Sequence, residues 1–122
     1  MSILIVEDEA PLRSKLIQLF TSGGFNVYQA TNGEEGLRQA FRSLPQVILT
    51  DINMPEMDGL TMLKELRSYG WGKNIPVIMF TNLNDAEAIA KAHLQGAADY
   101  LIKTQFEISN IVKLVKEKIQ NK

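Results

Sequence analysis

The sequence predicts a doubly wound α/β domain, in which helices cover both faces of a parallel sheet. Short, continuously apolar runs recur along the chain, and runs that do not alternate with polar residues indicate strands buried on both faces. Amphipathic segments with helix-start residues separate these runs. Strand and helix alternate five times. Right-handed crossovers between parallel strands turn that order into a three-layer sandwich.

Five segments are expected to be strands. Residues 3–6, 47–49 and 77–80 are continuously apolar, with the sequences Ile-Leu-Ile-Val, Val-Ile-Leu and Val-Ile-Met-Phe. Residues 26–30 and 98–102 are weaker candidates. Because the segment from residue 26 is more polar than the other four, we expect its strand at an edge of the sheet.

The first helix is predicted by its spacing and by the residues at its ends. Its apolar positions follow the i, i+4, i+7, i+8 pattern of one helix face and are Leu12, Leu16, Leu19 and Phe20. Pro11 suits a first turn, where a missing N–H costs nothing, and the glycine pair at 23–24 is expected to end the helix.

The other four helices are predicted by residues that cap helix starts. Three pairs have the spacing of a capping box, namely Asn32 with Glu35, Asn84 with Glu87, and Thr104 with Glu107. Asp58 precedes an amphipathic series that contains Leu60, Leu63 and Leu66. The last helix has an apolar stripe formed by Ile108, Ile111, Val112, Val115 and Ile119.

The composition fits one domain, residues 1–122, and excludes several classes of protein. Thirteen Lys plus Arg against fourteen Asp plus Glu leave a formal charge of −1, so nucleic-acid binding through bulk charge is not expected. The chain has no cysteine, which excludes disulfides and cysteine-ligated metals. The apolar runs are too short to span a membrane, and the acidic N-terminus does not resemble a signal peptide. We therefore expect a cytoplasmic domain that contacts no membrane.

Polar residues stand where the predicted core strands end. They are Glu7 and Asp8 after the first strand, Asp51 after the third, Thr81 at the end of the fourth and Lys103 after the fifth. The carboxyl ends of parallel strands lie along one edge of the sheet, and ligands of this fold class bind there. The sequence therefore predicts one shallow pocket with three carboxylates, one hydroxyl and one ammonium.

These residue types suit metal-assisted phosphoryl transfer. Crowded carboxylates need nearby positive charge, which Lys103 and a hard divalent cation can supply. Mg²⁺ prefers oxygen ligands, for which Glu7, Asp8, Asp51 and the backbone carbonyl of Asn53 are the candidates. A carboxylate can attack phosphorus to form an aspartyl phosphate, while Lys103 and the Thr81 hydroxyl stabilise the transferring oxygens.

Four segments together resemble the receiver domain of two-component response regulators. They are residues 3–9, 51–59, 80–81 and 96–103, with the sequences Ile-Leu-Ile-Val-Glu-Asp-Glu, Asp-Ile-Asn-Met-Pro-Glu-Met-Asp-Gly, Phe-Thr and Gly-Ala-Ala-Asp-Tyr-Leu-Ile-Lys. The resemblance covers essentially the whole chain and implies a chemotaxis-type single receiver or a receiver fragment. It also implies a flavodoxin-like sandwich of five helices around five strands in the order 2-1-3-4-5.

The resemblance also implies roles for the pocket residues. Asp51 would accept a phosphoryl group from a histidine kinase or phosphotransfer protein, with Mg²⁺ held by Glu7, Asp8, Asp51 and Asn53 and the phosphoryl group contacted by Lys103. Thr81 would then move toward the phosphoryl group, and Tyr100 would rotate inward behind Thr81. This shift would change the face made by the fourth helix, fifth strand and fifth helix.

The implied function is that of a signalling switch with no separate substrate. Its only activity would be its own phosphorylation and dephosphorylation. The changed face would regulate an output protein or a fused effector domain, and it is the candidate surface for a homodimer. Any contact with nucleic acid would be made outside these residues.

The sequence departs from the usual receiver pattern at two positions. Asn82 stands where Ala or Ser is common after the threonine, and its larger side chain could narrow access to the phosphoryl group. Thr104 replaces the proline that commonly follows the lysine. Because a cis bond before a non-proline residue costs roughly 2.5–4 kcal/mol, we expect a trans bond between Lys103 and Thr104.

Three other functions are compatible with parts of the pattern. A haloacid-dehalogenase-type phosphatase would place a general-acid Asp two residues after the nucleophile, where this chain has Asn53, and it would need a cap domain that does not fit in 122 residues. A flavodoxin-like cofactor carrier would place its phosphate loop where the acids at 7–9 repel phosphate. A degenerate receiver that only binds proteins would not need the intact acid set.

Overall fold

The computed structural model describes residues 1–120 and contains the predicted alternation of strands and helices. The strands are β1 (Ser2–Val6), β2 (Asn26–Ala30), β3 (Val47–Thr50), β4 (Val77–Thr81) and β5 (Asp99–Ile102). The helices are α1 (Ala10–Ser22), α2 (Gly33–Ser43), α3 (Gly59–Arg67), α4 (Ala86–Leu94) and α5 (Ile111–Gln120), the last preceded by a 3-10 turn at Ile108–Asn110. The observed order confirms the predicted one.

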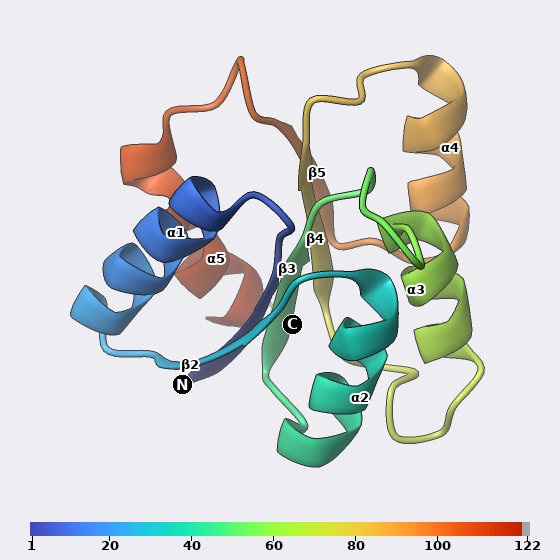
Figure 1. Ribbon diagram of the computed structural model, residues 1–122, viewed down its shortest axis with the longest axis horizontal. Helices are drawn as coiled ribbons and strands as arrows, with labels where there is room; N and C mark the ends of the chain where they lie inside the picture. Colours follow the sequence, from blue (N-terminus) through green and yellow to red (C-terminus); the bar gives the residue numbers. More distant parts are fainter. Residues whose placement is uncertain (121–122) are drawn as a thin grey trace.

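All strand pairs are parallel, and the sheet order is β2-β1-β3-β4-β5. This is the doubly wound order, and β2 is the edge strand that its polarity predicted. In Figure 1 the sheet separates α1 and α5 from α2, α3 and α4, which gives the three layers of the expected sandwich.

Two hydrophobic clusters fill the space between the layers. Along β1 the side chains of Ile3 and Ile5 belong to the cluster beneath α1 and α5, whereas Leu4 and Val6 belong to the cluster beneath α2, α3 and α4. All four are buried. Because successive strand residues point to opposite faces, a continuously apolar strand must be covered twice, as this one is.

Two of the predicted helix starts are confirmed by side-chain caps. The Asn32 side chain accepts from the Glu35 N–H at 2.8 Å, and Asp58 accepts from the Thr61 N–H at 2.7 Å. Pro11 lies in the first turn of α1, and Gly23 caps its C-terminus, as predicted. These local signals place the helices that lead away from the carboxyl ends of the strands.

Two other predicted caps are wrong. At α4 the cap is Asp85, whose side chain accepts from the Ala88 N–H at 2.8 Å, so the predicted cap residue Asn84 lies one position too early. Thr104 lies in a turn after β5, and the last helical segment starts only after Glu107, without a side-chain cap. The Thr104 side chain therefore stands too far from the helix start to cap it.

The predicted trans bond between Lys103 and Thr104 is confirmed, since no cis peptide bond occurs among the described residues. No helix in residues 1–120 has the length and apolar character that crossing a membrane requires.

Candidate functional site

The carboxyl ends of β1, β3, β4 and β5 bring the predicted site residues to one edge of the sheet. Ladder bonding continues just past the strand ends, since Asp51 N–H donates to the Val6 carbonyl at 3.1 Å and Lys103 N–H donates to the Thr81 carbonyl at 2.8 Å. These bonds fix the backbone of Asp51 and Lys103 relative to β1 and β4. Side chains that are 52 positions apart in the sequence therefore meet at this edge.

Lys103 forms the centre of the site. Its Nζ lies 2.7 Å from Oδ2 of Asp51 and 2.8 Å from Oε1 of Glu7, with Oε1 of Glu9 at 3.5 Å. Its side chain is only 9% exposed, as is that of Asp51, and the Glu7 side chain is 2% exposed. Ion pairs so shielded from water are stronger than surface pairs, but each member depends on the others to offset its desolvation.

The Asp51 carboxylate is held on both oxygens. Oδ1 accepts from the Ile52 N–H at 2.6 Å, and Oδ2 accepts from Lys103. The loop behind it packs tightly against the start of α3, where Gly59 N–H donates to the Ile52 carbonyl at 2.8 Å. A Cβ at Gly59 would stand 2.0 Å from the Asp51 carbonyl oxygen, so only glycine permits this approach. The structure thus orients Asp51 through the loop that follows it.

Glu7, Asp8 and Asp51 form the acidic cluster. One carboxylate oxygen from each lies within 4.8 Å of the others, and Asp8 is exposed while the other two are buried. When all are ionised, the three carboxylates of this cluster and Lys103 sum to a charge of −2, and Glu9 beside Lys103 adds one more negative charge. An oxygen-only set with this charge suits a hard divalent cation such as Mg²⁺. Asn53 is exposed and lies two residues beyond Asp51. Its backbone carbonyl remains a predicted ligand of the cation.

Burial and pairing shift the pKa values of two site residues. Burial raises the pKa of Glu7, and the hydrogen bond from Lys103 only partly opposes that shift. Burial lowers the pKa of Lys103, but hydrogen bonds to Asp51 and Glu7 outweigh it, so that the pKa is raised overall. The ammonium group therefore stays charged, which favours contact with a further anion.

Thr81 and Tyr100 are linked through one residue of the β4–α4 loop. The buried Thr81 Oγ1 accepts from the Leu83 N–H at 3.3 Å, and the half-buried Tyr100 hydroxyl donates to the Leu83 carbonyl. Burial, followed by the charges of Asp85 and Asp51, raises the pKa of Tyr100, which keeps its hydroxyl a donor. In this structure the Tyr100 side chain packs against the core cluster on its side of the sheet.

The sequence interpretation gave no role to two residues that support the site. Glu9 contacts Lys103, and its N–H donates to the Glu7 carboxylate at 3.1 Å. Arg13 donates to the Glu7 backbone carbonyl at 2.9 Å and to the Gln29 side chain at 3.2 Å. The acidic run at 7–9 signals Glu9, whereas the Arg13 contact depends on how α1 turns back over β1.

Comparison with curated proteins gives a family for this fold and this site. A model described as the response regulator receiver domain matches residues 3–116. Regulatory protein AtoC from Escherichia coli is 39% identical over 118 residues, which are 97% of this chain and 25% of AtoC. The DNA-binding transcriptional regulator NtrC from Escherichia coli is 35% identical over 98% of this chain and 25% of its own length. The chain thus spans about a quarter of these relatives.

Solved structures agree with that result. A CheY-like receiver domain protein from Methanospirillum hungatei is 25% identical, with a TM-score of 0.91 over 98% of this chain and 94% of its own. The receiver domain of a sensor histidine kinase from Pseudomonas aeruginosa is 26% identical, with a TM-score of 0.87 over 98% of this chain and 97% of its own. That domain was solved with a magnesium ion coordinated in its active-site cleft. From its fold, its acidic edge and these matches, the chain belongs to the receiver domains of two-component response regulators.

Proposed function

We propose that Asp51 is the phosphoacceptor of this receiver domain. The observation that carries the proposal is the Asp51–Lys103 contact of 2.7 Å inside a buried acidic cluster. A carboxylate oxygen of Asp51 attacks the phosphorus of a phosphohistidine on a histidine kinase or phosphotransfer protein. The P–N bond breaks, and the imidazole, which is protonated on its other ring nitrogen, leaves with the electron pair of that bond. The products are an aspartyl phosphate and a neutral histidine.

The residues around Asp51 lower the barrier by placing positive charge where the transferring group gathers negative charge. Lys103 already faces Oδ2 of Asp51 and is held there by Glu7. When the phosphoryl group arrives, its oxygens compete with Glu7 for the ammonium protons, and the Thr81 hydroxyl offers a further donor. Mg²⁺, held by Glu7, Asp8, Asp51 and the Asn53 carbonyl, would supply the positive charge that shields the acceptor from the incoming phosphoryl oxygens.

The proposed switch runs from Thr81 to Tyr100. If the Thr81 hydroxyl turns toward the phosphoryl group, its bond with the Leu83 N–H weakens, and the Leu83 carbonyl that accepts from Tyr100 moves with the loop. This couples the phosphorylated edge to the face of α4, β5 and α5. That face is the proposed contact for an output protein, a fused effector domain or a second copy of the domain.

We further propose a cytoplasmic domain that acts on no separate substrate. Its chemistry consists of its own phosphorylation and slow hydrolysis, and the domain itself makes no direct contact with nucleic acid. Asn53, two residues after the acceptor, has an amide that cannot transfer a proton, which disfavours a phosphatase mechanism with a general acid at that position.

Intact-mass measurement after incubation with acetyl phosphate and MgCl₂ tests the proposal. We expect the wild-type chain to gain one phosphoryl group and Asp51→Asn to gain none. Asp58→Asn is the matched control, because it makes the same change of charge at the cap of α3, where asparagine caps as well as aspartate. Phosphorylation of Asp51→Asn at the wild-type rate would refute the acceptor role.

A further inference from the structure

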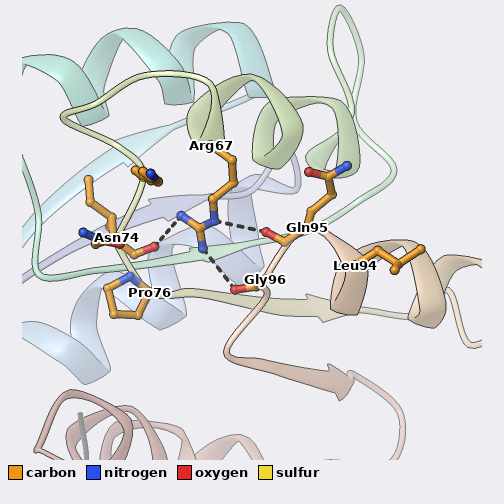
Figure 2. Close-up of a pocket in the computed structure, with 8 residues that line it drawn as sticks. Arg67, Asn74, Pro76, Leu94, Gln95 and Gly96 are labelled. Carbon is orange, nitrogen blue, oxygen red and sulfur yellow. Dashed lines mark hydrogen bonds between the residues drawn. The ribbon is translucent and has the colours of Figure 1, made fainter.

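A hollow of about 540 Å³ lies at the end of the sheet opposite Asp51. Residues 74–76, before β4, and residues 94–96, at the end of α4 and in the turn toward β5, form two of its walls. Arg67, the last residue of α3, reaches between these walls, as Figure 2 shows. Since the strands are parallel, their amino ends face away from the phosphoacceptor edge, and this hollow is separate from the site described above.

Arg67 is held in place by four backbone carbonyls. Its Nε donates to Gln95 at 3.0 Å and its Nη2 to Gly96 at 3.1 Å. Its Nη1 donates to Ile75 at 2.8 Å and to Gly72 at 3.0 Å. Gly96 itself adopts a left-handed conformation, with φ at +78°, which favours glycine in the turn that presents its carbonyl. The guanidinium is therefore fixed before any ligand arrives.

The hollow carries positive charge that no neighbouring carboxylate offsets. All four Arg67 acceptors are neutral, and burial alone lowers its pKa without changing its charge at neutral pH. Lys73, which is exposed, adds a second cation to the lining. Among residues 1–120 no carboxylate lies within 4.0 Å of either cation. These two cations thus attract an anionic ligand to the hollow, although the whole chain has a formal net charge of −1.

The rim of the hollow is open and partly apolar. Leu94 lines it and is 84% exposed, and Pro76 lines the opposite wall. Sites for small molecules bury most of the ligand surface, which an open wall of this kind does not do. A segment of another protein can instead lay an apolar side chain on Leu94 while it presents an acidic side chain to the cations.

We propose that this hollow binds an acidic segment of a partner protein, with a carboxylate against Arg67 and Lys73 and an apolar side chain against Leu94. The fifth N–H of the guanidinium and the three donors of Lys73 supply charge-assisted hydrogen bonds to that carboxylate. Because Arg67 is already ordered, binding loses little conformational entropy at this position.

An NMR titration of the ¹⁵N-labelled full chain tests the proposal. The probe is the blocked peptide Asp-Glu-Leu-Asp-Glu, and its neutral counterpart is Asn-Gln-Leu-Asn-Gln. We expect saturable shifts of the Gly72, Ile75 and Gly96 amides with the acidic peptide alone. Lys73→Glu should weaken binding about fivefold or more, through loss of one pair and new repulsion. Leu94→Ser should weaken it about threefold, because apolar contact is lost.

Lys15→Glu is the matched control, because Lys15 is an exposed lysine on α1 and the change alters net charge equally. It should bind like wild type, and so should Asp51→Asn, because the phosphoacceptor edge takes no part. The proposal is overturned if the neutral peptide shifts the same amides, or if Lys73→Glu binds as tightly as Lys15→Glu. It is also overturned if inorganic phosphate reproduces the shifts at the same concentration, since the hollow would then be a site for small anions.

Discussion

Two cations stand at opposite ends of the same sheet, and their partners differ. Lys103, at the carboxyl ends of the strands, contacts the carboxylates of Glu7, Asp51 and Glu9. Arg67, at the amino ends of β4 and β5, contacts four neutral carbonyls. Pairing raises the pKa of Lys103 despite its burial, whereas burial without a carboxylate lowers that of Arg67.

The difference separates a group that can exchange partners from one that fixes the fold. An ammonium among several carboxylates can pass from one anion to another, which suits a site where a phosphoryl group arrives and leaves. A guanidinium that joins the α3–β4 loop to the α4–β5 turn loses several hydrogen bonds if it moves. The acidic end therefore suits the proposed phosphoryl chemistry, whereas the basic end stabilises the fold and leaves one guanidinium N–H for the proposed partner.

Removing the carbonyl-bound cation should have the largest effect on stability. Arg67→Ala leaves four carbonyls without their donor, and we expect the free energy of unfolding to fall by about 3 kcal/mol. Urea denaturation measures it, with the exposed Lys64→Ala on the same helix as control, expected within about 0.5 kcal/mol of wild type. Equal stability of the two variants would show that Arg67 does not hold these loops together.

Removing the carboxylate-bound cation should chiefly affect chemistry. Lys103→Met keeps most of the length of the side chain but deletes its charge, and we expect phosphorylation by acetyl phosphate to slow about a hundredfold. Intact-mass time courses measure the rate. Lys118→Met is the control, because Lys118 takes no part in the acidic cluster. Its Nζ lies 3.4 Å from Oδ2 of Asp99, at the start of β5. An unchanged rate in Lys103→Met would remove the contrast between the two cations.

The loop link between the acidic edge and β5 should contribute less. Tyr100→Phe deletes the hydroxyl that donates to the Leu83 carbonyl, and we expect a loss of about 1 kcal/mol in the free energy of unfolding. Urea denaturation gives the value, and Tyr69→Phe, at an exposed tyrosine of the α3–β4 loop, should cost nothing measurable. Wild-type stability in Tyr100→Phe would mean that the Leu83 contact is not maintained in solution.

The smallest expected effect is a dependence on alkaline pH. Because the folded-state pKa of Lys103 is raised above its ordinary 10.5, its pairing contributes stability that is complete below that value. The contribution is lost as pH rises through the folded-state pKa. As pH rises from 10.5, the ordinary pKa of a lysine, the unfolding free energy of wild type should therefore approach that of Lys103→Met. A constant difference between the two across this range would contradict the pairing.

Most of the fold and the acidic edge follow from local patterns in the sequence. Continuous apolar runs predicted β1, β3 and β4. The acids Glu7, after β1, and Asp51, after β3, predicted the edge of the sheet at which the structure places the acidic cluster. Parallel topology then requires these residues to converge, so Glu7, Asp51 and Lys103 could be predicted to meet without knowledge of any distance.

The other end of the sheet could not be predicted in this way. The acceptors of Arg67 are backbone carbonyls, which every residue carries, so no residue type at positions 72, 75, 95 or 96 reveals the contact. The start of α4 was ambiguous for a related reason, since Asn84 and Asp85 are both good caps and only the path of the loop selects Asp85.

Chemical mapping of the phosphoryl group tests the central claim most directly. Borohydride reduces an aspartyl phosphate to homoserine, and sequencing the treated peptides by mass spectrometry locates the converted residue. After phosphorylation by acetyl phosphate with MgCl₂, we expect homoserine at position 51 alone. Conversion at Asp8 or Asp58, or a phosphorylated protein with Asp51 intact, would contradict the assignment of Asp51 as the acceptor.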